Sequence, residues 1–545
     1  MPGVERHIEW RVVALLAAVV TATLLLASPD SYLHDLYNRV DSAWFYLCGK
    51  AWFSGMTPYV DFTDSKGPLL WLIYGVAYLL SPRDYTGVYW LTCVSFTVTL
   101  WLIFRSARVV LPSRRLALLV SLLMPAAYFY PYIHEEVKVE HFAQPLIALC
   151  LYGTLLLRHG RNLRCFTPVR VLVATGAAMG CALMMKYSFV PMLAVFAIYS
   201  AHYARRHGCR LVHSLRWLAA GVTIAVLPWL LWMLAVGNLE AFVHQYFVNT
   251  LGTLGGLRDQ HGTLLDILRK LRLHHVVTLF PLLCVGGAVL MHYAQRTLHN
   301  AAPRDDVSAS SSAAWRIAHG ALSFPVVATV WFFVCTLPNA WWIYYYEICT
   351  WTLFFGITAV VLLLGRHWCV PSRTAVAAVA VTVVTAVGAW NVLLAPANFF
   401  TVSHPAREAY YRYAYLMRQV ERPTVVYWDI YSCGFETPAD GLPGTLYWAG
   451  QNGATPSMSA AQEQAVRDGN IDFVFVADTL HDARLREWGY RKWDYSQRDD
   501  IQGCDDLLYT LYTRHILQPP PAEVAPRTPI EIVTRHWKPL DNAQQ

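Results

Sequence analysis

The stretch Asn38-Arg-Val-Asp41-Ser-Ala-Trp-Phe-Tyr46, with Asp64-Ser-Lys66-Gly-Pro68 after it, follows the first apolar run of this chain. It places an acid, then an amphipathic aromatic segment, then an Asp–Lys pair closed by Gly-Pro. Most of the remaining sequence is apolar, and ionisable groups beside membrane-length apolar runs point to function. The pattern predicts a reactive polar site at a membrane surface.

The composition indicates a polytopic membrane protein. Of 545 residues, 56% are hydrophobic and 14% are charged, and the mean hydropathy is +0.33. Soluble domains carry about 25% charged residues. The formal net charge is +7, and the basic excess lies in loops on one side of the predicted bundle, which is an orientation signal. No soluble face combines Lys and Arg with aromatic residues, which excludes nucleic acid as a partner.

The apolar runs predict a mainly α-helical bundle of about eleven transmembrane spans, since each run approaches the ~20 residues that cross a bilayer. The runs lie near residues 12–28, 86–104, 116–132, 142–157, 170–185, 188–204, 216–236, 275–293, 317–337, 343–365 and 374–396. A further run at 68–81 is short and bounded by proline. We expect it to lie in the interface, inside a first external loop of about 29–85, because five arginine clusters then fall on one side.

Arginines near the first apolar run set the expected orientation. Arg6 and Arg11 lie at its start, so the N-terminus is expected in the cytoplasm. No small-residue cleavage site follows the run before Pro29, so we predict no cleavable signal. Residues 1–399 then form a transmembrane domain, and the region beyond it is extracytoplasmic.

Residues 400–518 change character and predict a small C-terminal α/β extracytoplasmic domain, because polar residues become more frequent and strands alternate with helices. The predicted helices are 404–421, 457–469 and 479–489, and the predicted strands are 424–428, 471–477 and 507–512. The region lacks a GxGxxG loop, so dinucleotide binding is not predicted. Cys433 and Cys504 could pair on the external side. The tail at 519–545 is proline-rich and expected to be extended.

Asp41 is the first candidate catalytic residue. A carboxylate directly before the segment 43–53 could equally cap a helix by accepting backbone N–H groups. Asp61, Asp64 and Lys66 follow in the same loop. They could form an ordinary turn before the interfacial helix, or Lys66 could offer an ammonium group to a phosphate at headgroup depth.

Glu140 and His141 end a second charged loop. Residues 134–141 contain four charged side chains and two histidines, which could form a solvated turn or the wall of a site. His134, Glu140 and His141 are metal ligands by type, but their spacing matches no specific motif. No metal site is assigned, and a divalent cation stays open.

Three further candidates lie at or inside the membrane boundary. Lys186 falls between two apolar runs, where it could serve a site or simply snorkel to the interface. Tyr345 belongs to an aromatic group that could be an interfacial belt. Glu347 lies inside an apolar run and is expected to face the bundle interior.

The order of these features resembles the GT-C superfamily of integral-membrane glycosyltransferases, and in particular the aminoarabinose transferase and protein O-mannosyltransferase branch. The resemblance covers roughly residues 10–400. It is carried by Asp41, Gly55-Met-Thr-Pro58-Tyr59, Asp61, Asp64-Ser-Lys66-Gly-Pro68, Glu140, Lys186 and the pair Tyr345/Tyr346. Two departures are that Ser42 follows Asp41 where many relatives have paired acids, and that Lys66-Gly-Pro stands in place of Lys-Pro-Pro. Both leave the acceptor class and metal dependence open.

The resemblance implies transfer of a sugar, with inversion, from a polyprenyl-phosphate-sugar donor to an extracytoplasmic glycan, lipid or protein acceptor of the cell envelope, at the plasma (inner) membrane. Asp41 matches the carboxylate thought to act as general base or to orient the acceptor. Lys66 matches the lysine that holds the donor phosphate, and we assign Lys186 and Tyr345 to the same phosphate. The orienting or substrate-binding group is Asp61, Asp64, Glu140, His141 and Glu347.

Two other classes of function fit part of the sequence. A transporter or flippase of lipid-linked sugars would place ionisable residues near the middle of the membrane and break its helices there. A non-catalytic envelope assembly protein would give no reason for Lys66 beside Asp64. Most acids cluster at one face, which favours the glycosyltransferase.

Overall fold

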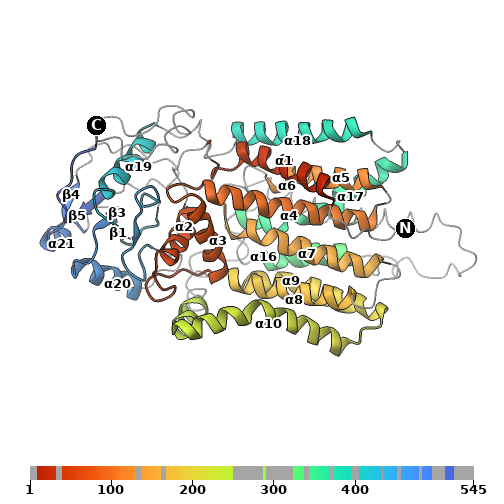
Figure 1. The fold of residues 1–545 in the computed structure, drawn as a ribbon, viewed down its shortest axis with the longest axis horizontal. Helices are drawn as coiled ribbons and strands as arrows, with labels where there is room; N and C mark the ends of the chain where they lie inside the picture. The colour runs from red at the N-terminus through yellow and green to blue at the C-terminus, as the bar shows by residue number, and fades with distance from the viewer. Residues whose placement is uncertain are drawn as a thin grey trace, which may run out of the picture.

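The computed structural model describes residues 9–31, 33, 40–111, 113–129, 137–160, 167–249, 286–289, 323–336, 343–367, 372–394, 404–432, 434–450, 456–477, 481–493 and 510–520. The described chain forms an elongated helical bundle that carries a small sheet at one end (Figure 1). The predicted pairing of Cys433 with Cys504 and the proline-rich tail lie outside the described residues.

The bundle consists of long helices that run roughly side by side (Figure 1). Its helices are α1 (Trp10–Ala27), α4 (Thr86–Val110), α5 (Arg114–Leu123), α6 (Pro125–Tyr128), α7 (Val139–His159), α8 (Thr167–Met185), α9 (Phe189–Ala204), α10 (Leu211–Val236), α16 (Phe324–Thr336), α17 (Leu353–His367) and α18 (Arg373–Leu394). Short irregular helices connect them: η1 (Arg205–His207), α11 (Leu239–Phe242), η2 (Val243–Asn249) and η4 (Ile343–Thr352).

Seven helical segments of the described chain are long and apolar enough to cross a membrane, which makes the chain a multi-pass membrane protein. The count of eleven spans stays a prediction, since most of 275–293 lies outside the described residues. One predicted run, 116–132, is broken into α5 and α6 at Pro125, because proline cannot continue the preceding helix.

Glycine allows two of these helices to approach closely. A Cβ atom at Gly176 of α8 would lie 2.0 Å from the Leu218 carbonyl oxygen of α10, and one at Gly221 of α10 would lie 2.1 Å from the Val173 oxygen. Small residues at such contacts let helix backbones touch where lipid supplies no hydrophobic drive. Backbone contact therefore fixes α10 against α8.

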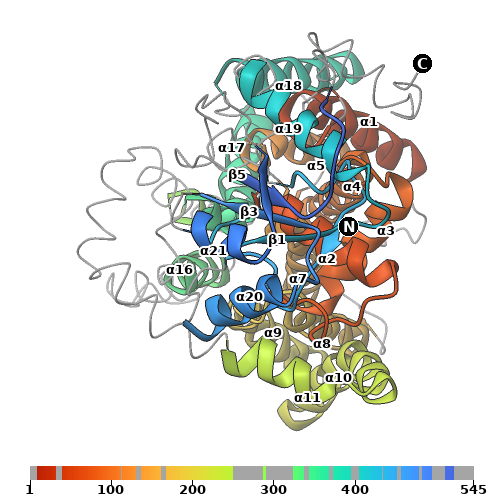
Figure 2. The same ribbon diagram turned by 90° about the vertical axis from the view of Figure 1, so that its left-hand side faces the viewer.

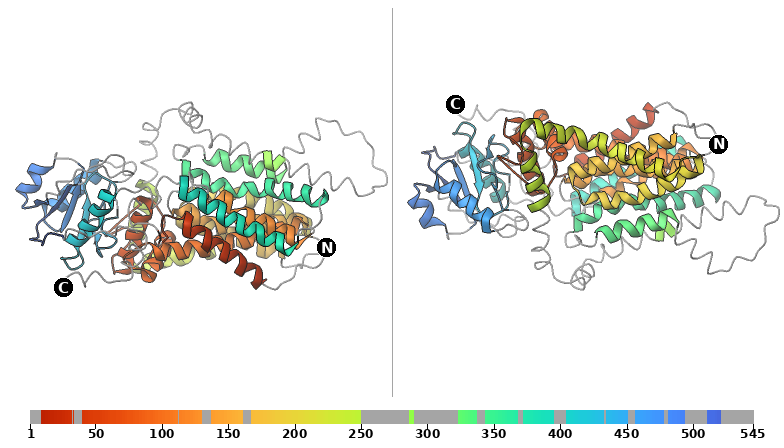
Figure 3. Two further views of the ribbon diagram at one scale, coloured as in Figure 1. Left: turned by 90° about the horizontal axis from the view of Figure 1, so that it is seen from above. Right: turned by 90° about the horizontal axis from the view of Figure 1, so that it is seen from below.

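Two shorter helices lie across the end of the bundle, between it and the sheet (Figures 1 and 3). They are α2 (Val40–Phe53) and α3 (Pro68–Leu80). Both are too short to cross a bilayer, which needs about 20 residues; the interfacial placement of 68–81 stays a prediction. A Cβ atom at Gly49 of α2 would lie 2.4 Å from the Gly75 nitrogen of α3, so the two helices pack backbone to backbone.

The C-terminal region contains a mixed five-stranded sheet with helices beside it (Figure 2). Its elements are α19 (His404–Met417), β1 (Thr424–Tyr427), β2 (Leu442–Pro443), α20 (Pro456–Arg467), β3 (Phe473–Val476), α21 (Asp482–Glu487), β4 (Arg491–Trp493) and β5 (Thr510–Thr513). The strand order is β2-β1-β3-β5-β4, with β1 parallel to β2 and β3 and the remaining pairs antiparallel. The alternation of strands and helices matches the prediction, while the short strands β2 and β4 had not been predicted.

Candidate functional site

The candidate residues meet where the loop between α2 and α3, the start of α7, the turn between α8 and α9, and η4 come together. Burial by itself lowers the pKa of Lys66, but the acidic groups around it outweigh burial and raise that pKa above its ordinary value. The groups that do so are Asp64, Asp41, Tyr345 and Glu140. Residues from four separate segments therefore share one electrostatic environment with Lys66, which keeps it a charged ammonium.

Lys66 is held by its own loop. Its Nζ donates to Ser65 Oγ at 2.8 Å and lies 3.8 Å from Asp64 Oδ1, and its side chain is 19% exposed. Burial raises the pKa of the Asp64 carboxyl, and Lys66 offsets only part of that effect. Tyr59, which adopts a left-handed φ of 66°, donates its hydroxyl to the Lys66 carbonyl at 3.0 Å. Such strain is tolerated where the surroundings fix the backbone.

Gly67 explains one departure from the family pattern. Its N–H donates to the Met185 carbonyl at 2.9 Å, and a Cβ atom there would lie 2.1 Å from the Met184 oxygen. Proline has no N–H to donate and carries a Cβ. The glycine therefore seats the Lys66 turn directly on the end of α8.

Asp41 lies in the first turn of α2, which begins at Val40. A carboxylate in this turn interacts favourably with the helix dipole, so the position of Asp41 also fits the alternative in which it stabilises the start of α2. Asp41 is half-buried, and its charge acts on both Asp64 and Lys66.

Ser42 explains the second departure. Its hydroxyl donates to the Val137 carbonyl at 2.7 Å and to Asp30 Oδ2 at 3.3 Å, and Asp30 Oδ2 also accepts the Val137 N–H at 2.9 Å. A buried tether to the segment before α7 thus occupies the position where relatives have a second acid. Sequence reasoning missed Asp30, which gives no local signal beyond being an acid at the end of an apolar run.

Glu140 and Lys186 form the tightest ion pair of the site. Lys186 Nζ lies 2.6 Å from Glu140 Oε1, and the two side chains are 13% and 1% exposed. The ammonium also lies 4.3 Å from the centre of the Tyr345 ring and 5.2 Å from that of Phe189. The turn at Lys186, predicted from the break between two apolar runs, is what brings this group to the start of α7.

His141 and Glu347 lie deeper. Glu347 faces the bundle interior as expected, and His141 Nδ1 lies 3.4 Å from Glu347 Oε1 with both side chains fully buried. The Gln144 amide donates to the Glu347 carbonyl at 3.0 Å. Both side chains are fully buried, so neither lies at the exposed surface of the site.

Two residues stand apart from the sequence-based assignment. Asp61 Oδ2 accepts the Thr57 N–H at 2.6 Å and so shapes its own loop. Lys138, which was not assigned to the site, is 3% exposed and places Nζ 3.4 Å from the centre of the Tyr344 ring. The indication in the sequence that Lys138 belongs to the site was its position two residues before Glu140. Within the described part of the chain no group of three or more His, Cys, Asp or Glu is arranged to hold a metal ion.

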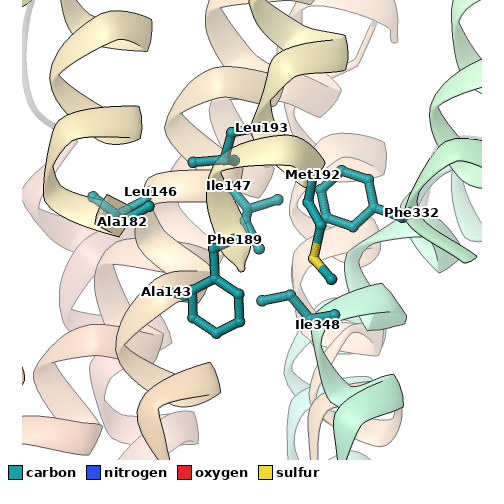
Figure 4. A pocket seen from close by; sticks show the side chains of 9 residues that line it. All are labelled: Ala143, Leu146, Ile147, Ala182, Phe189, Met192, Leu193, Phe332 and Ile348. Atoms are coloured by element: carbon teal, nitrogen blue, oxygen red, sulfur yellow. The ribbon is translucent and has the colours of Figure 1, made fainter. Parts of the chain in front are cut away.

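A small apolar cavity lies among α7, α8, α9, α16 and η4 (Figure 4). It is lined by Ala143, Leu146, Ile147, Ala182, Phe189, Met192, Leu193, Phe332 and Ile348. Phe189 belongs to this lining and also contacts the Lys186 ammonium. The site therefore joins fixed positive charge to an uncharged cavity within the bundle.

Residues 65–232 match the family model described as dolichyl-phosphate-mannose-protein mannosyltransferase. This segment contains Lys66, Lys138, Glu140 and Lys186. No curated protein sequence matches the chain.

Several solved structures are similar to this chain, and three of them are described next. ArnT from Cupriavidus metallidurans bound to undecaprenyl phosphate aligns with a TM-score of 0.55 at 14% identity, covering 95% of this chain and 100% of that one. The same protein in the apo state gives 0.47 and 12%, covering 93% and 98%. An oligosaccharyltransferase from Archaeoglobus fulgidus, in complex with Zn and sulfate, gives 0.39 and 13%, covering 88% and 69%. The first of these shows a shared fold over nearly the whole chain.

Proposed function

We propose that this chain, which has the ArnT-like fold of the GT-C membrane glycosyltransferases, transfers a sugar from a polyprenyl-phosphate-sugar donor to an extracytoplasmic acceptor. One observation carries the proposal: the Lys66 and Lys186 ammonium groups share Glu140 and Tyr345 as neighbours at one end of the bundle. Two fixed positive charges beside apolar helices suit the anionic head of a lipid phosphate. The ArnT relative is described as bound to undecaprenyl phosphate, a ligand of this chemistry.

Lys66, Lys186 and Tyr345 bind the donor phosphate in this proposal. The two ammonium groups supply fixed positive charge where the leaving phosphate gains negative charge, which stabilises the transition state more than the ground state. Tyr345 lies 4.3 Å below the Lys186 ammonium and holds it by a cation–π contact. Glu140 keeps Lys186 pointed at the site, while Asp64 does the same for Lys66.

Asp41 is the catalytic base. It accepts the proton of the acceptor hydroxyl as that oxygen bonds to the anomeric carbon from the face opposite the phosphate. The bond between the anomeric carbon and the phosphate oxygen breaks, and polyprenyl phosphate leaves with both electrons of that bond. Attack from the opposite face inverts the anomeric centre.

The acceptor is a glycan, lipid or protein of the cell envelope. We place the protein in the plasma (inner) membrane with its N-terminus in the cytoplasm, in keeping with described arginines such as Arg108, Arg114 and Arg205 at the bundle end away from the site. Residues 400–518 form the extracytoplasmic domain, and Asp61 shapes the loop that bears Lys66.

A flippase for lipid-linked sugars is the second candidate, and the fully buried His141–Glu347 pair favours it, because buried ionisable groups inside a membrane bundle mark transport pathways. Purified protein in vesicles distinguishes the two. Transfer releases free polyprenyl phosphate, whereas flipping moves intact donor between leaflets.

The test of the proposed function combines chemistry in cells and in vitro. Mass spectrometry of envelope glycans and lipids, with and without the gene, should reveal a product that differs by one sugar. The mass difference names the sugar, and the matching polyprenyl-phosphate-sugar is then used as donor in vitro. Asp41→Asn should lose transfer by a factor on the order of 10²–10⁴ and still insert normally into the membrane. Glu463→Gln, at an exposed surface pair with Arg484, is the matched control and should keep wild-type activity. Full transfer by Asp41→Asn would reject the assigned base.

A further inference from the structure

The C-terminal region packs against the loop and helices that carry the site, and the segment between β1 and α20 contributes several of the contacts. Trp448 lies with its ring centre 4.5 Å from that of Trp44 on α2. The Thr63 N–H donates to the Leu446 carbonyl at 3.1 Å. Figure 3 shows α2 held between the bundle and the sheet in both views.

A buried lysine lies in the middle of this contact. Lys50, in the last turn of α2, is 1% exposed. Its Nζ lies 3.8 Å from Asp440 Oδ1 and donates to the Glu436 carbonyl at 3.5 Å. Glu436 is itself fully buried and accepts from the Tyr427 hydroxyl at 2.5 Å and the Ser432 hydroxyl at 3.1 Å. One ammonium on α2 therefore meets a rigid acidic pocket of the C-terminal region.

This pair does not stabilise the fold in proportion to its burial. Burial lowers the pKa of Lys50 to about 8, and the attraction of Asp440 and Glu436 offsets only part of that effect. Desolvation of the ammonium thus costs more than its partners return, as is common for buried ion pairs. A well-packed apolar side chain would serve stability at least as well. The buried charge instead favours a single arrangement of α2 and the C-terminal region, because any other arrangement would leave the Lys50 ammonium unpaired.

We propose that Lys50 is a positioning residue, which docks the C-terminal region onto α2 through Asp440 and the Glu436 carbonyl and thereby holds Asp41 at the Lys66 site. Asp41 and Lys50 occupy the first and last turns of the same short helix. A shift of α2 at one end therefore moves the other. The inference deepens the proposed function and rests on it.

Arg83 provides an internal comparison. Its Nε lies 3.2 Å from Asp440 Oδ2, yet the two side chains are 44% and 39% exposed. Exposed pairs contribute little because water screens them. Asp440 thus pairs with two basic residues. The exposed Arg83 contributes little, whereas the buried Lys50 fixes the position of α2 against the C-terminal region.

The first experiment separates positioning from stability. Lys50→Met replaces the charge by an apolar chain of similar length. We expect a thermal midpoint equal to or above that of the wild type, an unchanged KM for the donor, and a kcat lower by about tenfold to a hundredfold, the scale of a small misplacement of catalytic groups. Lys50→Arg, which retains a charge, should recover part of the kcat. Arg83→Gln should behave as the wild type. Wild-type kcat in Lys50→Met would overturn the proposal.

A second experiment follows docking by the rate of a cross-link and then measures the kcat of the cross-linked protein. Arg422 Nη2 donates to the Ser54 carbonyl at 2.9 Å on the rim of the same contact. Ser54→Cys with Arg422→Cys can be joined by a short bismaleimide, with each single variant as control. We expect Lys50→Met to slow this cross-link, and the completed cross-link to restore its kcat.

The outcomes are separable. Cross-linking at the wild-type rate in Lys50→Met, or a cross-linked variant that stays slow, would refute the docking role. Absence of sugar transfer in the wild type would instead refute the proposed function, while a slowed cross-link in the variant would still support docking.

Discussion

Lys186 Nζ lies 2.6 Å from Glu140 Oε1, although the lysine lies in the turn after α8 and the glutamate in the first turn of α7. The two side chains are 13% and 1% exposed, so each partner depends on the other for its charge to be compensated. In the proposed function, Lys186 is one of the residues that bind the donor phosphate.

Removing one partner should therefore cost stability as well as binding. Lys186→Met leaves Glu140 buried without its ammonium, and we expect the variant to lose about 3–5 kcal/mol of stability and to raise the donor KM about tenfold or more. Glu140→Gln with Lys186→Met should restore stability and leave the donor KM high. Thermal unfolding in detergent and donor titration measure the two effects, and a normal donor KM in both variants would contradict a phosphate role for Lys186.

Gly67→Ala should weaken the site through backbone contact alone. The added Cβ would lie 2.1 Å from the Met184 carbonyl oxygen, a backbone atom that cannot move aside. Overpacking of this kind costs about 1–3 kcal/mol and should displace Lys66, so kcat and thermal midpoint should both fall. Gly153→Ala is the control, because its Cβ would meet only a Val171 methyl at 2.8 Å. Equal behaviour of the two variants would show that the Lys66 turn tolerates movement.

Filling the cavity should discriminate between donors by tail length. Ala143 is a small residue of the cavity lining (Figure 4). Ala143→Leu should raise the KM for a long-chain polyprenyl-phosphate-sugar and leave that for a water-soluble short-chain analogue unchanged. The ratio of the two KM values is the readout. If both donors respond equally, the cavity does not accommodate the lipid chain.

The pH dependence follows from Lys50. Its pKa in the folded protein is lowered to about 8, while an unfolded lysine stays protonated to about 10.4. Between these values the unfolded state binds more protons, so the free energy of unfolding should rise with pH. The link to Asp440 is present below about pH 8 and lost above it, so kcat should fall as pH rises through about 8.

Other charges face Lys50, and their contribution has to be separated from its own. They are Asp440, Glu436, Arg83 and Arg418. A pH profile of kcat for the wild type beside that of Lys50→Met isolates the lysine. The variant should lack the step near pH 8, and a step of the same size in both proteins would assign it to another group.

The sequence alone determined the class of protein and most candidates of the site. Apolar runs of membrane length require helices in a bundle, because only an intrasegment hydrogen-bond ladder satisfies the backbone in lipid. Ionisable residues such as Asp41, Lys66 and Lys186 stood out against that background for the same energetic reason. The break of the run 116–132 at Pro125 and the ten-residue irregular start of the segment 343–365 depended on local backbone geometry, which hydropathy does not register.

Only the tertiary structure decided which of these groups meet. Glu140 and Lys186 are brought into contact by the packing of α7 against α8, and Gly67 seats Lys66 on the end of α8. Lys50 carried no signal in the sequence, since a lysine in a short amphipathic helix is ordinarily solvated. Its role depends on a partner almost four hundred residues away, and periodicity along a chain tells which side chains are buried but not which ones face each other.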